Sequence, residues 1–354
     1  PPTWCPECRL QRRLVWRNER TLYKRTCDLC KMSVISMYSE SAPFPVYCSS
    51  CWWSDKWDAR EFGMEYDTSR PFFDQFRELM CQVPHEASQH KQSINSEYAN
   101  YVMSVKNVYL SYLIIESEDV SFSRFLLQCK NCVDCTYATG LENCVNVSRG
   151  GFCSDCSDSM IIDHSQNLQF CYDCVSCSEC YGYINLRHKK YHIFNEPYTK
   201  EEYERKIVGI RGQPLETQRA RVNEFFKTQP QRGYIHWNCG KNVSGEELYN
   251  CENCKDCYLI NYVRDSAYIF NTSSTGLSNE LTSNLYDCSL VADMTSSYEM
   301  TGGSKSNNCR FGVINDNSFS LEYSLWCYGS NDLFGCIGMR NRKYCILNKE
   351  YDKK

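Results

Sequence analysis

Histidine is scarce in this chain of 354 residues, and several other signals are missing altogether. Only six histidines occur, and none precedes His85. A metal-dependent nuclease centre in the first 84 residues would need histidine and an open metal position, so we do not expect one there. No stretch of 18 apolar residues predicts a membrane span, and no charged-then-apolar leader is visible. We expect a protein without a membrane span, located in the cytoplasm or in a virion.

The chain also lacks a strong net charge and the common catalytic motifs. Its formal charge of -4 does not predict wholesale coating of nucleic acid. We find no Ser-His-Asp grouping, phosphate-binding loop or dinucleotide fingerprint. Acidic residues that a polysaccharide-cleaving enzyme would use are spread along the repeats: Asp134, Asp155, Asp158 and Asp163. We therefore expect no enzyme, and keep a polysaccharide-active enzyme or a nuclease as an alternative.

Cysteine, in contrast, is abundant. The chain has 26 cysteines, and many of them fall in C-x-x-C pairs. In a long chain this pattern indicates metal binding in a reducing compartment more than a disulfide framework. Three pairs lie ahead of the repeats: Cys5 and Cys8, Cys27 and Cys30, Cys48 and Cys51.

The spacing of these pairs allows the middle one to share a zinc ion with either neighbour. Eighteen residues separate the first two pairs and 17 separate the last two, and both gaps fit a site built from two knuckles. We favour one structural zinc held by Cys27, Cys30, Cys48 and Cys51, with Cys5 and Cys8 as competing or additional ligands. Four thiolates leave no open position for water, so the site predicts folding and not catalysis.

The first 31 residues are basic in a chain that is acidic overall. They hold eight basic and three acidic residues, with Trp4, Trp16 and Tyr23 interleaved. Basic and aromatic side chains together are what phosphate contact and base stacking require. The candidate polyanion-binding residues are Arg9, Arg12, Arg13, Arg17, Arg20, Lys24 and Arg25. Nucleic-acid binding through this module is an alternative function, and a solvated helix face is the simpler interpretation.

A twelve-residue period organises most of the remaining chain. Similar phrases begin at Asn107, Asp119, Asn131, Asn143, Asp155, Asn167 and Glu179, and an apolar residue follows each anchor. A fixed period over this length is typical of stacked repeats. Asn and Asp tolerate a left-handed backbone, so the anchors predict tight bends. We predict a mainly β fold with β-solenoids.

The width of one solenoid coil is left open by the period. Twelve residues would enclose a narrow lumen filled by cysteine or other small residues, and the Tyr-, Phe- and Leu-rich repeats favour a wider coil of 24. Cysteines in one phase would stack as an inward thiol ladder: Cys132, Cys144, Cys156 and Cys180. Disulfides and metal sites are the other interpretations, including for Cys171, Cys174, Cys177 and Cys180.

A closing phrase occurs twice and indicates a tandem duplication. RHKKYHIFNEPY from Arg187 matches RNRKYCILNKEY from Arg340, 153 residues later. Thr199 and Glu202 form a capping-box pattern after the first copy. Near the N-terminus, Ser69 is expected to cap a helix that ends before Pro84, and Trp52, Trp53 and Trp57 are expected to form a small core. The predicted organisation is a zinc-ribbon-like module with a helix at 1–92, a first β-solenoid with cap at 93–198, a helical linker at 199–230, and a second β-solenoid with cap at 231–354.

These phrases carry a resemblance over essentially the whole chain. CPECRLQRRLVWRNERTLYKRTCDLC, CWWSDKWD, SRPFFDQF, the repeats and NLRHKKYHIFN resemble an uncharacterised group of cysteine-rich, zinc-ribbon-bearing hypothetical proteins from environmental bacterial and phage genomes. The resemblance implies a zinc module followed by repeats and brings no activity with it. We therefore expect a zinc-stabilised scaffold that presents solenoid surfaces to a protein or polymer partner, as a virion or appendage component would.

Overall fold

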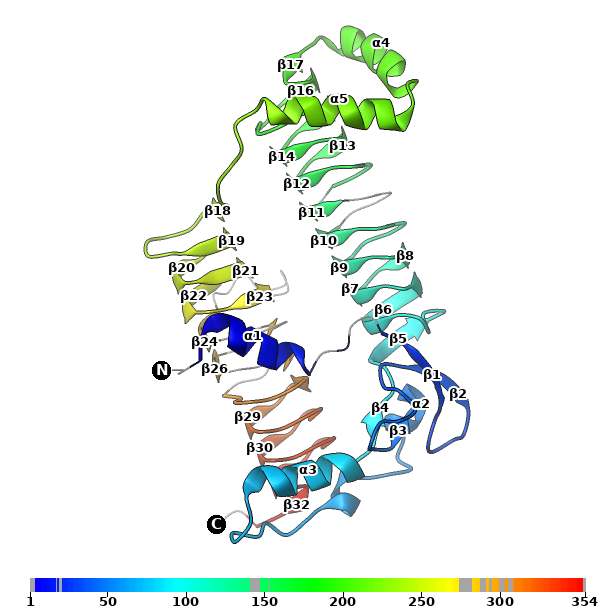
Figure 1. Cartoon of the computed structure of the whole chain (residues 1–354), viewed down its shortest axis with the longest axis vertical. Helices are drawn as coiled ribbons and strands as arrows, with labels where there is room; N and C mark the ends of the chain where they lie inside the picture. Colours follow the sequence, from blue (N-terminus) through cyan, green and yellow to red (C-terminus); the bar gives the residue numbers. More distant parts are fainter. Residues whose placement is uncertain are drawn as a thin grey trace.

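The computed structural model describes residues 4–16, 18, 21–140, 147–151, 153–273, 282–286, 291–292, 295–298, 303–304 and 308–352. About 17 coils of twelve residues form two β-solenoid arms, and strand is the dominant secondary structure. Figure 1 shows the first arm rising to a pair of helices and the second descending from β18 to β32, with the N-terminal module at the foot of both. Every described helix is too short or too polar to cross a lipid bilayer.

The N-terminal module combines short strands with helices. Its elements are α1 (Pro6–Leu14), β1 (Tyr23–Thr26), β2 (Ser33–Ser36), β3 (Val46–Tyr47), α2 (Ser49–Trp52), η1 (Ala59–Phe62), α3 (Phe72–Gln82) and β4 (His85–Glu86). β1 and β2 pair antiparallel, and β3 pairs with β4 in parallel.

The start of α3 corrects the predicted cap. Pro71, not Ser69, occupies the N-cap position, and no side chain caps the helix. Ser69 instead donates its Oγ hydrogen to Asp67 Oδ1 at 2.6 Å, within the preceding turn. Gln75 closes that turn, because its amide donates to the Asp67 carbonyl at 2.9 Å.

The first arm is a stack of parallel strands that ends in one antiparallel strand. Its strands are β5 (His90–Ile94), β6 (Asn100–Tyr109), β7 (Tyr112–Ile115), β8 (Glu118–Ser121), β9 (Arg124–Leu127), β10 (Thr136–Thr139), β11 (Ser148–Gly151), β12 (Met160–Asp163), β13 (Gln166–Gln169), β14 (Tyr172–Val175), β15 (Ser178–Tyr181), β16 (Lys190–Ile193) and β17 (Glu196–Pro197). Only β17 runs antiparallel, against β16.

The second arm repeats this plan. Its strands are β18 (His236–Trp237), β19 (Gly245–Tyr249), β20 (Glu252–Lys255), β21 (Cys257–Asn261), β22 (Val263–Ala267), β23 (Phe270–Ser273), β24 (Thr282–Tyr286), β25 (Val291–Ala292), β26 (Thr295–Tyr298), β27 (Gly303–Ser304), β28 (Asn315–Asp316), β29 (Phe319–Glu322), β30 (Asn331–Phe334), β31 (Lys343–Ile346) and β32 (Lys349–Glu350). β32 runs antiparallel against β31.

The coil is twelve residues wide, so the preference for 24 was wrong. Strand partners are twelve residues apart throughout, as in Lys106 with Glu118 and Val108 with Val120. The anchors adopt the left-handed conformation predicted for them, with φ between 49° and 57° in the six that are described. Positive φ also recurs at every third residue between them, as at Leu110 and Leu113. A bend at every third residue gives each coil four short sides.

The same three-residue period fills the lumen and explains how a narrow coil accommodates large residues. Val108, Ser111, Ile114, Ser117 and Val120 are all buried, and each lies three residues after the last. Large aromatic residues occupy positions between the inward ones and therefore point outward. Anchor Asn143 and Cys144 lie outside the described residues.

Helices α4 (Lys200–Arg211) and α5 (Leu215–Lys227) pack on the end of the first arm instead of only linking the two arms. The predicted capping box is present, because Glu202 N donates to Thr199 Oγ1 and Thr199 N donates to Glu202 Oε2. Tyr203, Ile207 and Val222 are buried against the strands.

The N-terminal module in turn packs on the second arm, far along the chain. Trp52 and Trp57 are buried in one cluster with residues of the second arm, whereas Trp53 is 43% exposed. The predicted tryptophan core is therefore formed by two of the three residues, and it is shared between the module and the second arm. The Arg340 guanidinium lies over both buried indoles and donates to the carbonyls of Ser54 and Trp57.

Candidate metal centre

The first knuckle of the metal centre is the turn of the β1–β2 hairpin. Cys27 N donates to Met32 O and Lys31 N donates to Cys27 O, both at 2.9 Å. Lys31 takes a positive φ of 65°, which turns the chain back after Cys30. The hairpin thereby presents two thiols from one tight bend.

The second knuckle lies at the start of α2, directly after β3. Cys48 is the N-cap residue of this helix and Cys51 lies in its first turn. Cys48 N donates to the Cys27 sulfur at 3.2 Å, so the backbone of one knuckle contacts the thiol of the other. The pairing of β3 with β4 fixes this knuckle to the base of the first arm.

The four sulfurs predicted as ligands are brought together. Those of Cys27, Cys30, Cys48 and Cys51 all lie within 4.8 Å of one another. The Cys30 and Cys48 sulfurs are 3.8 Å apart. A tetrahedron with Zn–S bonds of about 2.3 Å has edges of about 3.8 Å, so the donor set fits a four-thiolate metal ion.

The surroundings of the sulfurs differ in a way that distinguishes two thiols. Burial acts to raise the pKa of Cys27, but N–H groups of Cys30, Cys48 and Leu29 point at its sulfur and lower the pKa to about 7. Burial and the neighbouring thiols raise the pKa of Cys51 to about 12. A bound cation would supply the charge needed to hold all four as thiolates.

Cys5 and Cys8 do not join this group. Both are exposed at the start of α1, where Cys8 N donates to the Cys5 sulfur at 3.4 Å. Among the described residues, the four-cysteine group is the one cluster with metal-ligand geometry. Cys5 and Cys8 therefore serve as a natural control for it.

The predicted polyanion-binding residues do not form one exposed surface. Arg9, Arg13 and Arg25 are buried. Arg25 is engaged inside the module, where it pairs with Asp28 at 3.0 Å and donates to Ser39 O. Arg12 and Lys24 are exposed, and Arg12 lies over the Trp4 ring. Arg17 and Arg20 lie outside the described residues.

The cysteines of the two arms have a different role, which matches the predicted inward thiol ladder. Cys132, Cys156 and Cys180 are fully buried, and every described cysteine is a free thiol. Each inward thiol donates to the carbonyl two residues before it, as Cys180 does to Ser178 O at 3.2 Å. Burial raises the pKa of Cys180 to about 12, which keeps it protonated as a donor.

Two buried ionisable residues beside the metal centre had no signal in the sequence. Glu86 follows α3 directly, and its Oε1 accepts from Ser49 Oγ at 2.7 Å and from Trp53 Nε1 at 3.0 Å. Burial raises the pKa of Glu86 to about 8. Burial also lowers the pKa of His85 to about 3, and the ring of His85 stacks on Phe44 with centroids 3.6 Å apart. Their burial depends on β3, which is distant in sequence from β4.

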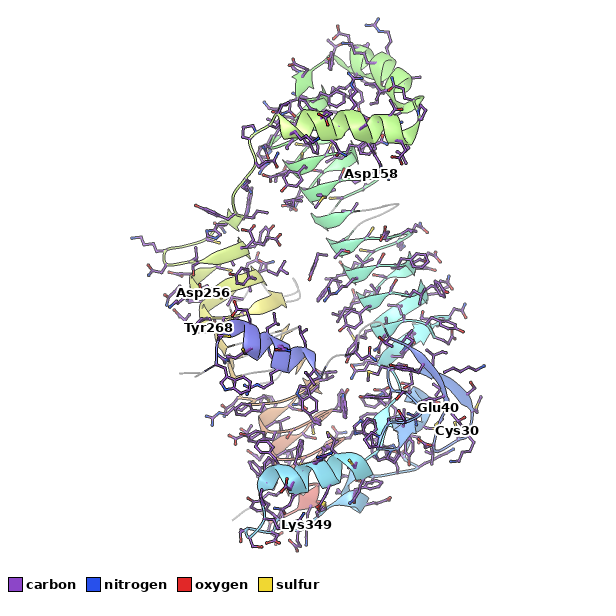
Figure 2. All side chains as sticks on the ribbon, in the orientation of Figure 1. Cys30, Glu40, Asp158, Asp256, Tyr268 and Lys349 are labelled. Carbon is purple, nitrogen blue, oxygen red and sulfur yellow. The ribbon has the colours of Figure 1, made fainter. Side chains whose placement is uncertain are left out.

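Figure 2 shows how far the metal centre lies from the other end of the first arm. Cys30 is on the N-terminal module, whereas Asp158 lies below α5. Asp158 pairs with Arg219 of α5 at 2.9 Å, and Asp163 pairs with His164 at 2.8 Å. These two acids therefore take part in ion pairs on the surface of the arm.

Comparison with known proteins adds no family to this description. No protein-family model matches the chain, and no curated protein matches it significantly.

Proposed function

We propose that the protein is a non-catalytic scaffold, stabilised by zinc, that presents solenoid surfaces to a protein or polymer partner. The observation that supports this most directly is a row of exposed aromatic rings on the first arm. Tyr98, Tyr109 and Phe122 are 47%, 46% and 55% exposed. Adjacent ring centroids are 5.8 Å apart in both steps of the row.

A polar ladder lies close to this aromatic row in the sequence and on the same coils. Asn95 donates to Asn107 at 3.2 Å, and Asn107 donates to Asp119 at 2.7 Å, each one coil further along. Exposed rings combine large contact area with little side-chain entropy to lose, and neighbouring amides and carboxylates supply directional hydrogen bonds. Such a surface suits an elongated partner that lies along the arm.

The interior of the arm supports rigid presentation of that surface. Ser111 Oγ donates to Tyr109 O at 2.9 Å and accepts from Ser123 N at 3.0 Å in the next coil. Inward hydroxyls and thiols thus pair the backbone groups that point into the lumen, and each coil is bonded to the next. A surface held by many such bonds has little freedom to rearrange.

We assign zinc to the four-cysteine centre because four thiolates in a tetrahedron are the usual donor set of structural zinc. The centre lies where β3 joins β4 at the base of the first arm, so we propose that the metal fixes the module against the arms. The free thiols favour a reducing compartment, the cytoplasm or a virion.

The proposal is tested by photocrosslinking in cells that produce the protein. Benzoylphenylalanine in place of Tyr109 should give one discrete adduct, and the same probe should lose that adduct when Tyr98 and Phe122 are replaced by Ser. The probe in place of Met160, which is 46% exposed elsewhere on this arm, is the matched control. Equal labelling at Tyr109 and Met160, or none at Tyr109, would contradict the proposal.

A further inference from the structure

The tandem duplication gives each residue near the end of the second arm a counterpart 153 positions earlier. The two closing asparagines show that this correspondence is structural. Asn195 accepts from Ile184 N at 2.9 Å, and Asn348 accepts from Ile337 N at 2.7 Å. Both asparagines have φ of 64°. The ends of the two arms can therefore be compared side chain by side chain.

In the first arm, one face of this end is covered by α4. Tyr203 and Ile207 of the helix are buried in a cluster with Tyr181 and Ile193 of the strands. The rings of Tyr203 and Tyr191 have centroids 5.7 Å apart. Tyr181 and Ile193 retain only 0% and 5% exposure beneath the helix.

A cation extends the contact stripe of α4 by one further turn. Arg211 Nε donates to Gln169 Oε1 at 3.2 Å. Tyr203, Ile207 and Arg211 are each four residues apart, so they lie along one side of the helix. The strand face is thus matched to an aromatic, an aliphatic and a basic residue at successive turns.

In the second arm, the corresponding face is an open groove of about 390 Å³. Phe334, Tyr344 and Ile346 line it and correspond to Tyr181, Tyr191 and Ile193. Phe334 and Ile346 are only partly buried, whereas their counterparts are fully buried.

Among the described residues, α3 covers the side next to this groove and leaves the groove itself open. The Phe72 ring of α3 lies 4.6 Å from the Phe334 ring and 5.2 Å from the Tyr323 ring, between centroids. In the first arm, α5 takes the comparable place, because Gln218 accepts from the Tyr181 hydroxyl at 3.0 Å. The neighbour of α4 thus has a counterpart in the second arm, but α4 has none in the described part of the chain.

The charge of the groove indicates what would occupy it. Glu322 stands where the first arm has Gln169, and Asp332 stands where it has Glu179. Arg310 pairs with Glu322 at 3.2 Å and offsets part of that charge. A carboxylate at the position of Gln169 would attract a helix cation more strongly than an amide does.

We propose that this groove binds an amphipathic, basic helix of another protein. The contact face of that helix carries an aromatic residue, an aliphatic residue and an Arg or Lys at positions i, i+4 and i+8, as α4 does. The inference rests on the proposed scaffold function, for which it names one partner chemistry. It uses a surface distinct from the aromatic row of the first arm.

The probe for the test is a fluorescein-labelled peptide of residues 196–213 of this chain, measured by fluorescence anisotropy against the full protein. An isolated helix of this length is only partly formed, so we expect a Kd of roughly 10–100 µM. Ile346→Glu in the protein should weaken binding at least about tenfold, since a carboxylate would be buried under the helix. Phe122→Glu, on the first arm, is the matched control and should leave the Kd unchanged.

A charge exchange identifies the orientation of the helix. A peptide with Arg211→Glu should bind the wild-type protein about fivefold to tenfold more weakly. The same peptide should regain affinity for the Glu322→Lys protein. An increase in Kd that Glu322→Lys does not reverse would overturn this assignment of the basic residue.

Other outcomes would overturn the proposal as a whole. Absence of binding at 1 mM peptide, about ten times the weakest Kd expected, or binding that Ile346→Glu does not affect, would exclude the groove as a helix site. A dimer of the protein that Ile346→Glu dissociates would assign the groove to a second copy. Photocrosslinking at Tyr109 is independent of the groove, so adducts there without peptide binding would refute this inference and leave the scaffold function standing.

Discussion

At the scale of single residues, the metal centre depends on two knuckles that the spacing of cysteines foretold. The choice between Cys5 with Cys8 and Cys48 with Cys51 as partners of the middle pair was not determined by spacing. It is decided by β3, which delivers Cys48 to the hairpin and makes its N–H a donor to the Cys27 sulfur. Strand pairing of this kind joins residues far apart in sequence, which local patterns do not reveal.

Replacing Cys48 should release the metal. In Cys48→Ser, one of the four thiolates is lost, and we expect bound zinc to fall from about one per chain to near zero and the module to lose about 3 kcal/mol or more. Elemental analysis and thermal unfolding under reducing conditions measure both. Cys5→Ser should keep the zinc and the melting temperature, and loss of metal in that variant would place the site elsewhere.

Glu86 should make stability depend on pH. In the folded protein its pKa is raised to about 8 by burial, whereas an unfolded Glu titrates at about 4.3. The folded state therefore holds a proton that the unfolded state lacks between these values, and the free energy of unfolding decreases as pH rises from about 4.5 to 8. Glu86→Gln should remove a decrease of a few kcal/mol across this window, as measured by urea unfolding at pH 5, 7 and 9. Glu40→Gln, on the surface of the same module, should behave like the wild type at all three values, and an unchanged pH profile in Glu86→Gln would contradict the assignment.

At the scale of elements, the coil shows what a period can and cannot predict. Twelve residues and the left-handed anchors were visible in the sequence, but the three-residue alternation of inward and outward positions was masked by mixed residue types. Val, Ile, Leu, Ser and Cys all point inward, because hydrophobicity is only one requirement of the lumen. The other is a short donor for the backbone carbonyl, which Ser and Cys share and which hydrophobic patterns do not score.

A single inward serine should therefore matter more than its size implies. Ser123 Oγ donates to Ser121 O at 2.8 Å and accepts from Cys135 N at 3.0 Å. Ser123→Ala leaves both groups without this partner and should cost about 1–3 kcal/mol. Ser123→Cys keeps a donor and should cost less.

Hydrogen exchange at the Cys135 amide reports this effect locally. Its protection should drop in Ser123→Ala and remain higher in Ser123→Cys. Ser104→Ala, at an exposed position of the same arm, is the control. Equal protection in all three variants would show that the hydroxyl does not hold the next coil.

At the scale of the whole molecule, the first residues of the chain close the last coils. Asp58 pairs with Arg342 at 2.9 Å, Asn348 donates to Ala59 O at 2.9 Å, and Lys349 pairs with Glu65. The duplication and the solenoid class were readable from the sequence. The attachment of the module to the second arm was not, because contacts across some 280 residues leave no periodic trace.

Removing Arg340 should loosen this attachment. Arg340→Ala removes hydrogen bonds to two carbonyls and the contact with two indoles, and we expect faster hydrogen exchange at residues 54–59 together with a loss of about 2–4 kcal/mol. Arg187→Ala, at the equivalent position of the first arm, should not change exchange at 54–59. If only Arg187→Ala raised it, the attachment would not depend on Arg340.

The two antiparallel strands that end the arms have a consequence for assembly in solution. A stack of identical coils could in principle grow into a fibre, since each exposed coil offers unpaired backbone groups to the next molecule. β17 and β32 turn the final edge back on itself, and Pro197 within β17 has no N–H to offer. Charged Lys349 and Glu350 occupy the other edge. End-to-end polymerisation is thereby blocked at both of these ends, and the protein can carry long stacks of parallel strands without seeding amyloid-like growth from them.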